Sequence, residues 1–177
     1  MSDKKIFIAG FGGQGVLLIG QMLSYAAMYE GKEVTWMPSY GPEMRGGTAN
    51  CTVCIADKPI ASPVAATCDV FVAMNGPSLE KFESIVGPGG DLFINTSVVS
   101  QKATRNDINV YYVDTIGLAD SVVGNEKTAN MVMLGAIIRK TEAVSLDIMD
   151  KVFEKVMSGK KAKLIPANKK ALDAWTE

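Results

Sequence analysis

The sequence contains no histidine, and only three of its 177 residues are cysteine. Histidine is the commonest general base and the commonest metal ligand in proteins, so neither role can fall to it here. An iron–sulfur cluster normally takes four cysteine ligands. Cys51, Cys54 and Cys68 are therefore too few for this chain to hold a cluster alone, and their odd number without secretory features argues against a disulfide framework. The sequence predicts no metal site within this chain.

Long apolar runs are also missing, and neither sign of charge dominates. No uninterrupted apolar segment approaches the roughly 20 residues of a membrane span. Gln14 and the glycines around it interrupt the N-terminal apolar run that a signal peptide would need. The 18 basic and 19 acidic side chains leave a formal net charge of −1, which gives no electrostatic reason to expect nucleic acid. We therefore expect a cytoplasmic protein that binds neither membranes nor nucleic acid.

What the sequence does contain is an alternation of strand-like and helix-like segments. Hydrophobic residues make up 47% of the chain and charged residues 21%, as in ordinary folded domains. Apolar patterning predicts strands at residues 4–9, 33–37, 50–56, 69–74, 91–95 and 110–114, and helices at residues 14–30, 78–86, 127–140 and 145–157. This order predicts an α/β protein in which residues 1–177 form a single Rossmann-like domain, with a mostly parallel sheet flanked by helices and a helical C-terminal end.

Two local patterns lead to more specific expectations. The helix expected at residues 127–140 is apolar on nearly all sides, which predicts burial between the sheet and another layer. Met131 and Met133 lie on different faces of this helix, so at least one of them is expected to contact a partner chain. The glycines and proline at residues 87–90 predict a turn.

The glycine cluster after the first expected strand is the first candidate site. Residues 10–15 read GFGGQG and satisfy the G-x-G-x-x-G pattern between a strand and a helix. Such a turn lets a ligand approach the backbone, and the first amides of the helix can receive a phosphate. The candidate ligand contacts are Gly10, Gly12, Gly13, Gln14 and Gly15. A tight turn that binds nothing is the alternative.

A nicotinamide dinucleotide fits this turn poorly. The NAD fingerprint also needs an acidic residue at the end of the second strand, about 20 residues further on. That strand is expected to end in Met37, Pro38 and Ser39, whereas Glu33 stands at its start, at the opposite edge of the sheet. A NAD-dependent dehydrogenase is therefore disfavoured, while the phosphates of another nucleotide-bearing ligand remain compatible with the turn.

The second candidate site is the loop SYGPEMRGGT at residues 39–48. Because it follows the second strand, it should lie at the same sheet edge as the glycine turn, where open α/β sheets bind ligands. Glu43 supplies a carboxylate and Arg45 a guanidinium, and the glycines after Arg45 allow a ligand or another chain to approach closely. The candidate residues are Tyr40, Glu43, Arg45, Gly46, Gly47 and Thr48. A solvated loop with a surface ion pair is the alternative.

Two further motifs have simpler explanations. Cys51 and Cys54 have the spacing of a redox motif, but residues three apart on a strand point to opposite faces, so we interpret them as small buried residues. The C-terminal region also holds a cluster of lysines: Lys160, Lys161, Lys163, Lys169 and Lys170. We interpret this cluster as a solvated helix end, with docking to an acidic partner as the alternative.

Three blocks of the sequence resemble the gamma subunit of 2-oxoacid:ferredoxin oxidoreductases, the pyruvate, 2-oxoisovalerate and 2-oxoglutarate enzymes. The blocks are GFGGQGV at residues 10–16, SYGPEMRGGTANC at residues 39–51 and EKTANMVMLGA at residues 126–136. The resemblance covers nearly the whole chain. It implies an oxidoreductase subunit, inactive alone, in a complex that converts a 2-oxoacid, coenzyme A and oxidised ferredoxin into acyl-CoA, carbon dioxide and reduced ferredoxin.

The resemblance also implies where cofactors and partners lie. In this family thiamine diphosphate, Mg and the iron–sulfur cluster belong to partner subunits, and coenzyme A is a co-substrate. The gamma part is a Rossmann-like domain that helps close around coenzyme A. The implied partners are the alpha and beta subunits, with a delta subunit as a further candidate, and ferredoxin through the complex. The resemblance implies no catalytic residue in this chain alone, a phosphate contact at the glycine turn, and Glu43 and Arg45 at the active-site or intersubunit face.

Other functions remain compatible with the sequence. The small subunit of indolepyruvate:ferredoxin oxidoreductase resembles the same domain and differs in its substrate. A free-standing nucleotide- or CoA-binding module needs only the glycine turn, and a structural scaffold needs no ligand. When isolated, the chain is expected to be able to form a homodimer, because apolar surface meant for partners can pair with itself.

Overall fold

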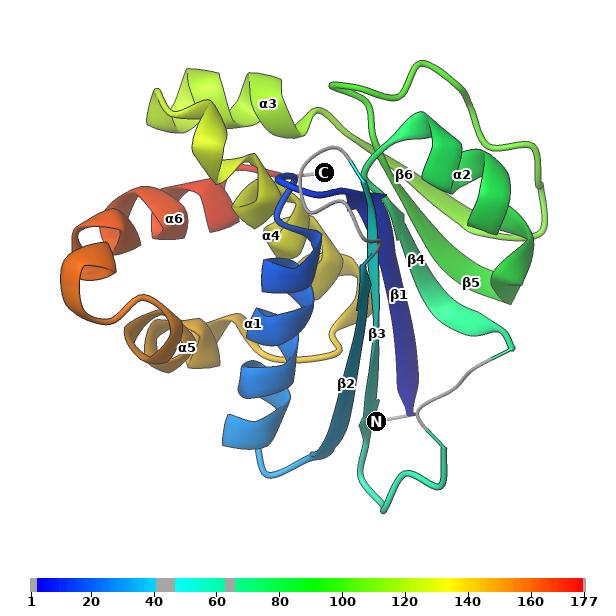
Figure 1. Ribbon diagram of the computed structural model, residues 1–177, viewed down its shortest axis with the longest axis horizontal. Coiled ribbons are helices and arrows are strands. Elements are labelled where there is room, and N and C mark those ends of the chain that lie inside the picture. The colour runs from blue at the N-terminus through cyan, green and yellow to red at the C-terminus, as the bar shows by residue number, and fades with distance from the viewer. Residues whose placement is uncertain (1–2, 41–46, 63–65, 177) are drawn as a thin grey trace.

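The computed structural model describes residues 3–40, 47–62 and 66–176, which form a six-stranded sheet with helices on both faces (Figure 1). The strands are β1 (Lys4–Phe11), β2 (Glu33–Tyr40), β3 (Thr48–Ala56), β4 (Cys68–Ala73), β5 (Val86–Asn95) and β6 (Asn109–Val113). The α-helices are α1 (Val16–Tyr29), α2 (Gly76–Phe82), α3 (Thr115–Leu118), α4 (Ala129–Thr141), α5 (Met149–Val156) and α6 (Ile165–Leu172). Shorter helical turns are η1 (Glu83–Ile85), η2 (Ala119–Val123), η3 (Glu126–Thr128), η4 (Leu146–Ile148) and η5 (Gly159–Leu164). The longest of these helices, α1, has 14 residues, and none in the described ranges combines the length and apolar character needed to cross a bilayer.

The sheet has the strand order β2-β3-β1-β4-β5-β6. The pairs β1–β4, β4–β5 and β5–β6 are parallel, whereas β3 runs antiparallel to both of its neighbours. β3 turns back because only residues 41–47 join it to β2, and a parallel pair would need a much longer crossover. The expected α/β class, with a mostly parallel sheet and a helical C-terminal end, is confirmed.

The two faces of the sheet carry different helices. α1, α4, α5 and α6 pack on one face, around the larger cluster of buried apolar residues (Figure 1). α2 covers part of the other face, where Phe82 packs against Phe7 and Phe71. Because α1 follows β1 and α2 follows β4, two neighbouring parallel strands continue to opposite faces. Such a switch point opens a crevice at the carboxyl ends of the strands, where open α/β sheets bind ligands.

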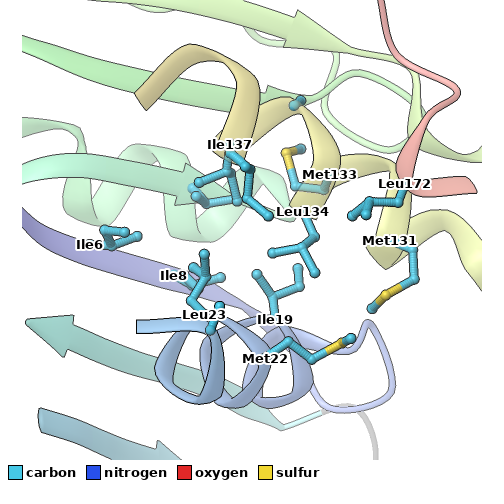
Figure 2. Packing of buried hydrophobic residues seen from close by; sticks show 14 of the residues in the cluster. Ile6, Ile8, Ile19, Met22, Leu23, Met131, Met133, Leu134, Ile137 and Leu172 are labelled. Atoms are coloured by element: carbon cyan, nitrogen blue, oxygen red, sulfur yellow. The ribbon is translucent and has the colours of Figure 1, made fainter. Parts of the chain in front are cut away.

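Helix α4 is central to the larger cluster, as its apolar sequence predicts. Figure 2 shows its side chains packed among those of β1, α1 and α6, with labels on Ile6, Ile8, Ile19, Met22, Leu23, Met131, Met133, Leu134, Ile137 and Leu172. Met131 and Met133 are both 0% exposed, so the expectation that one of them meets a partner chain is wrong. α6 packs on α4, and a Cβ at Gly135 would overlap the carbonyl oxygen of Leu172. Other parts of this chain therefore cover both methionines of α4.

Residues 87–90 lie inside β5 and not in a separate turn before it. The pairing of β5 with β4 passes from Cys68–Val86 to Val70–Asp91, so extra residues interrupt the ladder on the β5 side. Gly89 takes a φ of 74° within this irregularity. Glycine permits such a bulge, and this explains why the composition resembles that of a turn.

Candidate functional site at the glycine turn

The glycine turn joins the carboxyl end of β1 to the start of α1. β1 continues through Gly10 to Phe11, so residues 12–15 form the turn itself. Gly15 is the N-cap of α1 with a φ of 77°, a left-handed conformation that glycine adopts without steric strain. The first turn of α1 contains no acidic side chain, and its first amides have no carbonyl partner within the helix. This helix end therefore presents partial positive charge to the space above the turn.

Packing explains two of the glycines, Gly10 and Gly15. A Cβ at Gly10 would lie 2.6 Å from Oε1 of Gln14 and 2.7 Å from the Cβ of Met74. A Cβ at Gly15 would lie 2.8 Å from the Cβ of Asn130 in α4. At separations this short, a Cβ at either position would force the neighbouring side chains to shift. The two glycines thus let the turn approach the end of β4 and the start of α4.

The side chain of Gln14 points into the protein and bridges the switch point. Its Oε1 accepts a hydrogen bond from the backbone N of Phe11 (2.7 Å), and its Nε2 donates to the carbonyl oxygen of Met74 (2.9 Å). Met74 directly follows β4, so one side-chain amide ties the turn after β1 to the end of the neighbouring strand. Gln14 therefore shapes the turn from inside, and its contact with a ligand stays a prediction.

Gly12 and Gly13 form the outer tip of the turn. Gly13 has a φ of 99°, and a Cβ there would meet no atom within 4 Å. The N–H of Gly12 donates to the carbonyl oxygen of Gly47 (2.9 Å), the residue before β3. The end of the second candidate loop thus lies against the glycine turn, as expected for two connections at one sheet edge.

The remaining residues of that loop are only partly described. Tyr40 ends β2 and pairs with Ala49 of β3, while Thr48 begins β3 and pairs with Phe11 of β1. Three predicted residues lie outside the described ranges: Glu43, Arg45 and Gly46. Their place at an active-site or intersubunit face stays a prediction.

Two pockets adjoin the turn, and both include Gly13, Gly15 and Leu18 in their linings. The first, of about 460 Å³, is walled by the tip of the turn, the apolar first residues of α1 and the start of β3. The second, of about 480 Å³, extends across the carboxyl ends of the strands toward α3, η3 and α4. Its polar lining comprises Gln14, Asn95, Thr115, Glu126, Lys127 and Asn130. The glycine turn therefore lies between two hollows, and more of the residues that line the second one are polar or charged.

A polar network borders the second pocket, and the sequence interpretation did not identify it. The Thr115 hydroxyl donates to Oδ1 of Asn95 (2.7 Å), and the Ser97 hydroxyl donates to Oδ1 of Asp114 (2.6 Å). The Ser97 Oγ also accepts from the backbone N of Ile116 (2.8 Å). These bonds hold β5 and β6 together at their carboxyl ends. Polar residues directly after two apolar strands were the signal that could have located this network.

The described residues are suited to binding and orienting a ligand. Lys127 contributes a cation and Glu126 an anion at the second pocket, and the start of α1 contributes backbone amides. No cluster of three or more acidic or cysteine side chains in the described ranges could hold a metal ion. The site thus offers charged side chains of both signs and backbone amides beside the two pockets.

The cysteines lie in the packed interior, which confirms the interpretation of Cys51 and Cys54 as small buried residues. Cys51, Cys54 and Cys68 are all buried. Burial raises the pKa of Cys51 from an ordinary 9.0 to about 12, and burial together with the nearby Asp69 raises that of Cys68 to about 12. Thiols that remain protonated at neutral pH are poor nucleophiles. The burial of both side chains agrees with a packing role for Cys51 and Cys54.

The fold and the site together define a class of protein. A glycine turn at the switch point of a mostly parallel sheet is typical of a nucleotide- or cofactor-binding domain. Residues 5–176 match the family described as pyruvate ferredoxin/flavodoxin oxidoreductase, and the chain belongs to this family.

Particular relatives agree with the resemblance found in the sequence. The chain is 36% identical to ketoisovalerate oxidoreductase subunit VorA of Methanothermobacter thermautotrophicus, over 99% of this chain but only 36% of that protein's length. It is 34% identical to the 2-oxoglutarate synthase subunit KorC of Methanocaldococcus jannaschii, over 98% of this chain and 95% of that protein. The solved gamma subunit of a keto/oxoacid ferredoxin oxidoreductase from Geobacter sulfurreducens PCA superposes with a TM-score of 0.80 at 30% identity, over 97% of this chain and 95% of that one. The resemblance to gamma subunits is confirmed.

Proposed function

We propose that this chain is the gamma subunit of a thiamine-dependent 2-oxoacid:ferredoxin oxidoreductase. The complex converts a 2-oxoacid, coenzyme A and oxidised ferredoxin into an acyl-CoA, carbon dioxide and reduced ferredoxin. The family match over residues 5–176 supports this assignment. Thiamine diphosphate, Mg and the iron–sulfur cluster are assigned to the alpha and beta subunits, and to a delta subunit where one is present. The gamma chain then binds and encloses, and partner subunits carry the chemistry.

The observation that carries the proposed role is the apolar pocket beside the start of α1. Coenzyme A joins a charged diphosphate to a long and largely apolar pantetheine arm. The unpaired amides at the start of α1 suit the diphosphate, and the walls formed by Val16, Leu17 and Leu18 suit the arm. We therefore assign the glycine turn to the coenzyme A side of a composite active site.

Gly13→Ala in the reconstituted complex tests this assignment. The added methyl group would stand at the open tip of the turn, where no atom of this chain lies within 4 Å and where the ligand is proposed to approach. We expect the KM for coenzyme A to rise about tenfold or more, equivalent to about 1.4 kcal/mol of lost binding. The subunits should still elute together in gel filtration.

Gly31→Ala is the matched control. Gly31 also has a positive φ (73°), and a Cβ there would likewise meet no atom within 4 Å, but it follows the C-terminal end of α1, away from the glycine turn. Both variants thus introduce similar backbone strain at different places. An increase in the coenzyme A KM in both variants, or in neither, would contradict the proposed role of the turn and favour a scaffold.

Co-purification tests the assembly itself. Native isolation should yield this chain together with thiamine-binding and cluster-binding subunits and with 2-oxoacid-dependent ferredoxin reduction. A chain that elutes alone, without such activity, would contradict the proposal. Tight, stoichiometric NAD binding in calorimetry would favour a free-standing binding module, and preference for indolepyruvate among the 2-oxoacids would favour the indolepyruvate enzyme.

A further inference from the structure

The proposed site leaves the C-terminal lysines without a role, and all of them lie in two consecutive elements of the structure, η5 and α6. The residues of this lysine surface are Lys160, Lys161, Lys163 and Leu164 of η5, with Lys169 and Lys170 of α6. Residues 158–172 contain five of the 18 basic residues and none of the 19 acidic ones. The rest of the chain therefore has 13 basic and 19 acidic residues, a net charge of −6. The lysine surface is thus a concentrated positive region on an otherwise acidic protein.

The fold holds this surface in a defined shape and leaves it in solvent. Residues 158–164 are all exposed, and Gly159–Leu164 form the 3₁₀-helix η5. α6 anchors the segment, because Ala171 and Leu172 are buried and Arg139 of α4 donates to the Leu172 carbonyl oxygen (2.7 Å). In Figure 1 the orange and red segment that contains η5 and α6 lies at the margin of the molecule opposite α2. Its exposure is therefore a feature of folded structure.

Most of the ammonium groups are available to an outside partner. Lys169 forms an ion pair with Asp150 (2.8 Å). Within the ranges that the structure describes, Lys160, Lys161 and Lys163 form no ion pair. Leu164 stands next to them with 43% of its surface exposed. The surface thus offers several positive charges around one apolar side chain.

An acidic protein fits this surface better than a nucleic acid or a membrane. Nucleic-acid sites commonly add arginine or aromatic side chains that stack on bases, and residues 158–172 contain neither. A membrane-surface helix needs a broad exposed apolar face, whereas the apolar residues Ala171 and Leu172 of α6 are buried in this chain. Protein interfaces have a polar, solvent-accessible rim, and exposed lysines suit such a rim.

The chemistry of the surface also indicates a partner that binds and leaves. Lysine is depleted in stable protein interfaces, and ion pairs between exposed charges are weak and screened by salt. Such charges mainly raise the rate of encounter. The family description names a protein that must arrive and depart during turnover, the electron carrier ferredoxin or flavodoxin.

We propose that the lysine surface steers a small, acidic electron-carrier protein to the assembled complex. The inference rests on the proposed function. The ammonium groups attract the carboxylates of the carrier, and Leu164 provides an apolar contact once the carrier has arrived. This chain transfers no electron itself, since the redox centres are assigned to other subunits.

Charge reversal in the reconstituted complex tests the proposal, with the ferredoxin of the same cell as the probe. In the triple variant K160E/K161E/K163E we expect the KM for ferredoxin to rise about tenfold or more at low ionic strength. The KM values for the 2-oxoacid and coenzyme A should not change, nor should the rate with a neutral small-molecule acceptor. Added salt should raise the ferredoxin KM of the wild type steeply and that of the variant only slightly.

The triple variant K58E/K81E/K102E is the control, because it makes the same change in net charge at exposed lysines elsewhere. Its ferredoxin KM should stay within about twofold of the wild-type value. An unchanged ferredoxin KM in K160E/K161E/K163E would overturn the proposal. Loss of the other subunits in gel filtration would also overturn it, since the lysine surface would then be a permanent subunit contact. If the wild-type complex oxidises no 2-oxoacid with either acceptor, the proposed function fails, which is a separate result.

Discussion

The inner part of the glycine turn (Gly10 and Gly15) and its tip (Gly12 and Gly13) both consist of glycine, but for different physical reasons. At the inner part, side chains of Gln14, Met74 and Asn130 leave no room for a Cβ at Gly10 or Gly15. At the tip, Gly13 has open space around it, and its φ of 99° alone favours glycine. The inner glycines therefore build the fold, while the tip is the part that a ligand can approach. It follows that a glycine motif cannot be read as a count of ligand contacts.

Gly15→Ala should have the largest effect of the changes that test this comparison. An alanine there combines left-handed backbone strain of about 1–2 kcal/mol with overpacking against Asn130 of about 1–3 kcal/mol. We expect the free energy of unfolding, measured in urea, to fall by about 2–5 kcal/mol. Gly13→Ala has the strain without the overlap and should lose only about 1–2 kcal/mol. Equal losses in the two variants would remove the distinction between the inner part and the tip.

Gln14→Ala should have an intermediate effect. It removes the hydrogen bonds to the Phe11 N–H and the Met74 carbonyl, each of which contributes about 0.5–1.5 kcal/mol. We therefore expect a loss of about 1–3 kcal/mol in the same urea measurement. Gln101→Ala is the control: its exposed side chain makes a long bond to Glu80 (3.3 Å), so its removal should change stability by less than about 0.5 kcal/mol. If Gln14→Ala left the free energy of unfolding unchanged, the two hydrogen bonds of the Gln14 side chain would not stabilise the turn.

The smallest expected signal is the labelling of the buried cysteines by a thiol reagent. Cys51 lies under the start of α1, where its Sγ is 3.7 Å from the carbonyl oxygen of Val16, so it reports on opening of the inner part of the turn. In the native wild type at pH 8, Cys51 and Cys68 should not react with a thiol reagent on the timescale that labels the urea-unfolded chain. Gly15→Ala should speed labelling of Cys51 more than that of Cys68. Rapid labelling of native Cys51 would contradict its burial.

The same two thiols predict a pH dependence of stability. Their pKa values are raised from 9.0 to about 12 in the folded protein, chiefly by burial. Above pH 9 the unfolded chain loses these protons while the folded chain keeps them, so the unfolded state binds fewer protons and stability falls with rising pH. The contribution is fully present below pH 9 and is lost between pH 9 and about 12. Replacing Cys51 by Ala should make urea stability less sensitive to pH across this range.

Much of the site could be predicted because its signals are local in the chain. The strand, the glycine turn and the helix follow one another directly, and β2 runs in the same direction as β1, so the loop after it reaches the same sheet edge. The antiparallel direction of β3 could also be predicted from the sequence, because the connection from Tyr40 to Thr48 is too short for a parallel crossover. The sequence could not show that this chain itself covers both Met131 and Met133, because a helix pattern identifies apolar faces without saying which neighbours cover them.

The amino-acid sequence alone was enough to establish the α/β class, the position of the glycine turn at a sheet edge and the family to which the chain belongs. What each residue of the turn does became clear only from the packing of the folded chain. Gln14 meets Met74 across 60 positions of the chain, and Gly15 meets Asn130 from another helix. Steric exclusion between such distant segments depends on how strands and helices pack. No local pattern contains that information, because dihedral preference and hydrophobic periodicity describe one segment at a time.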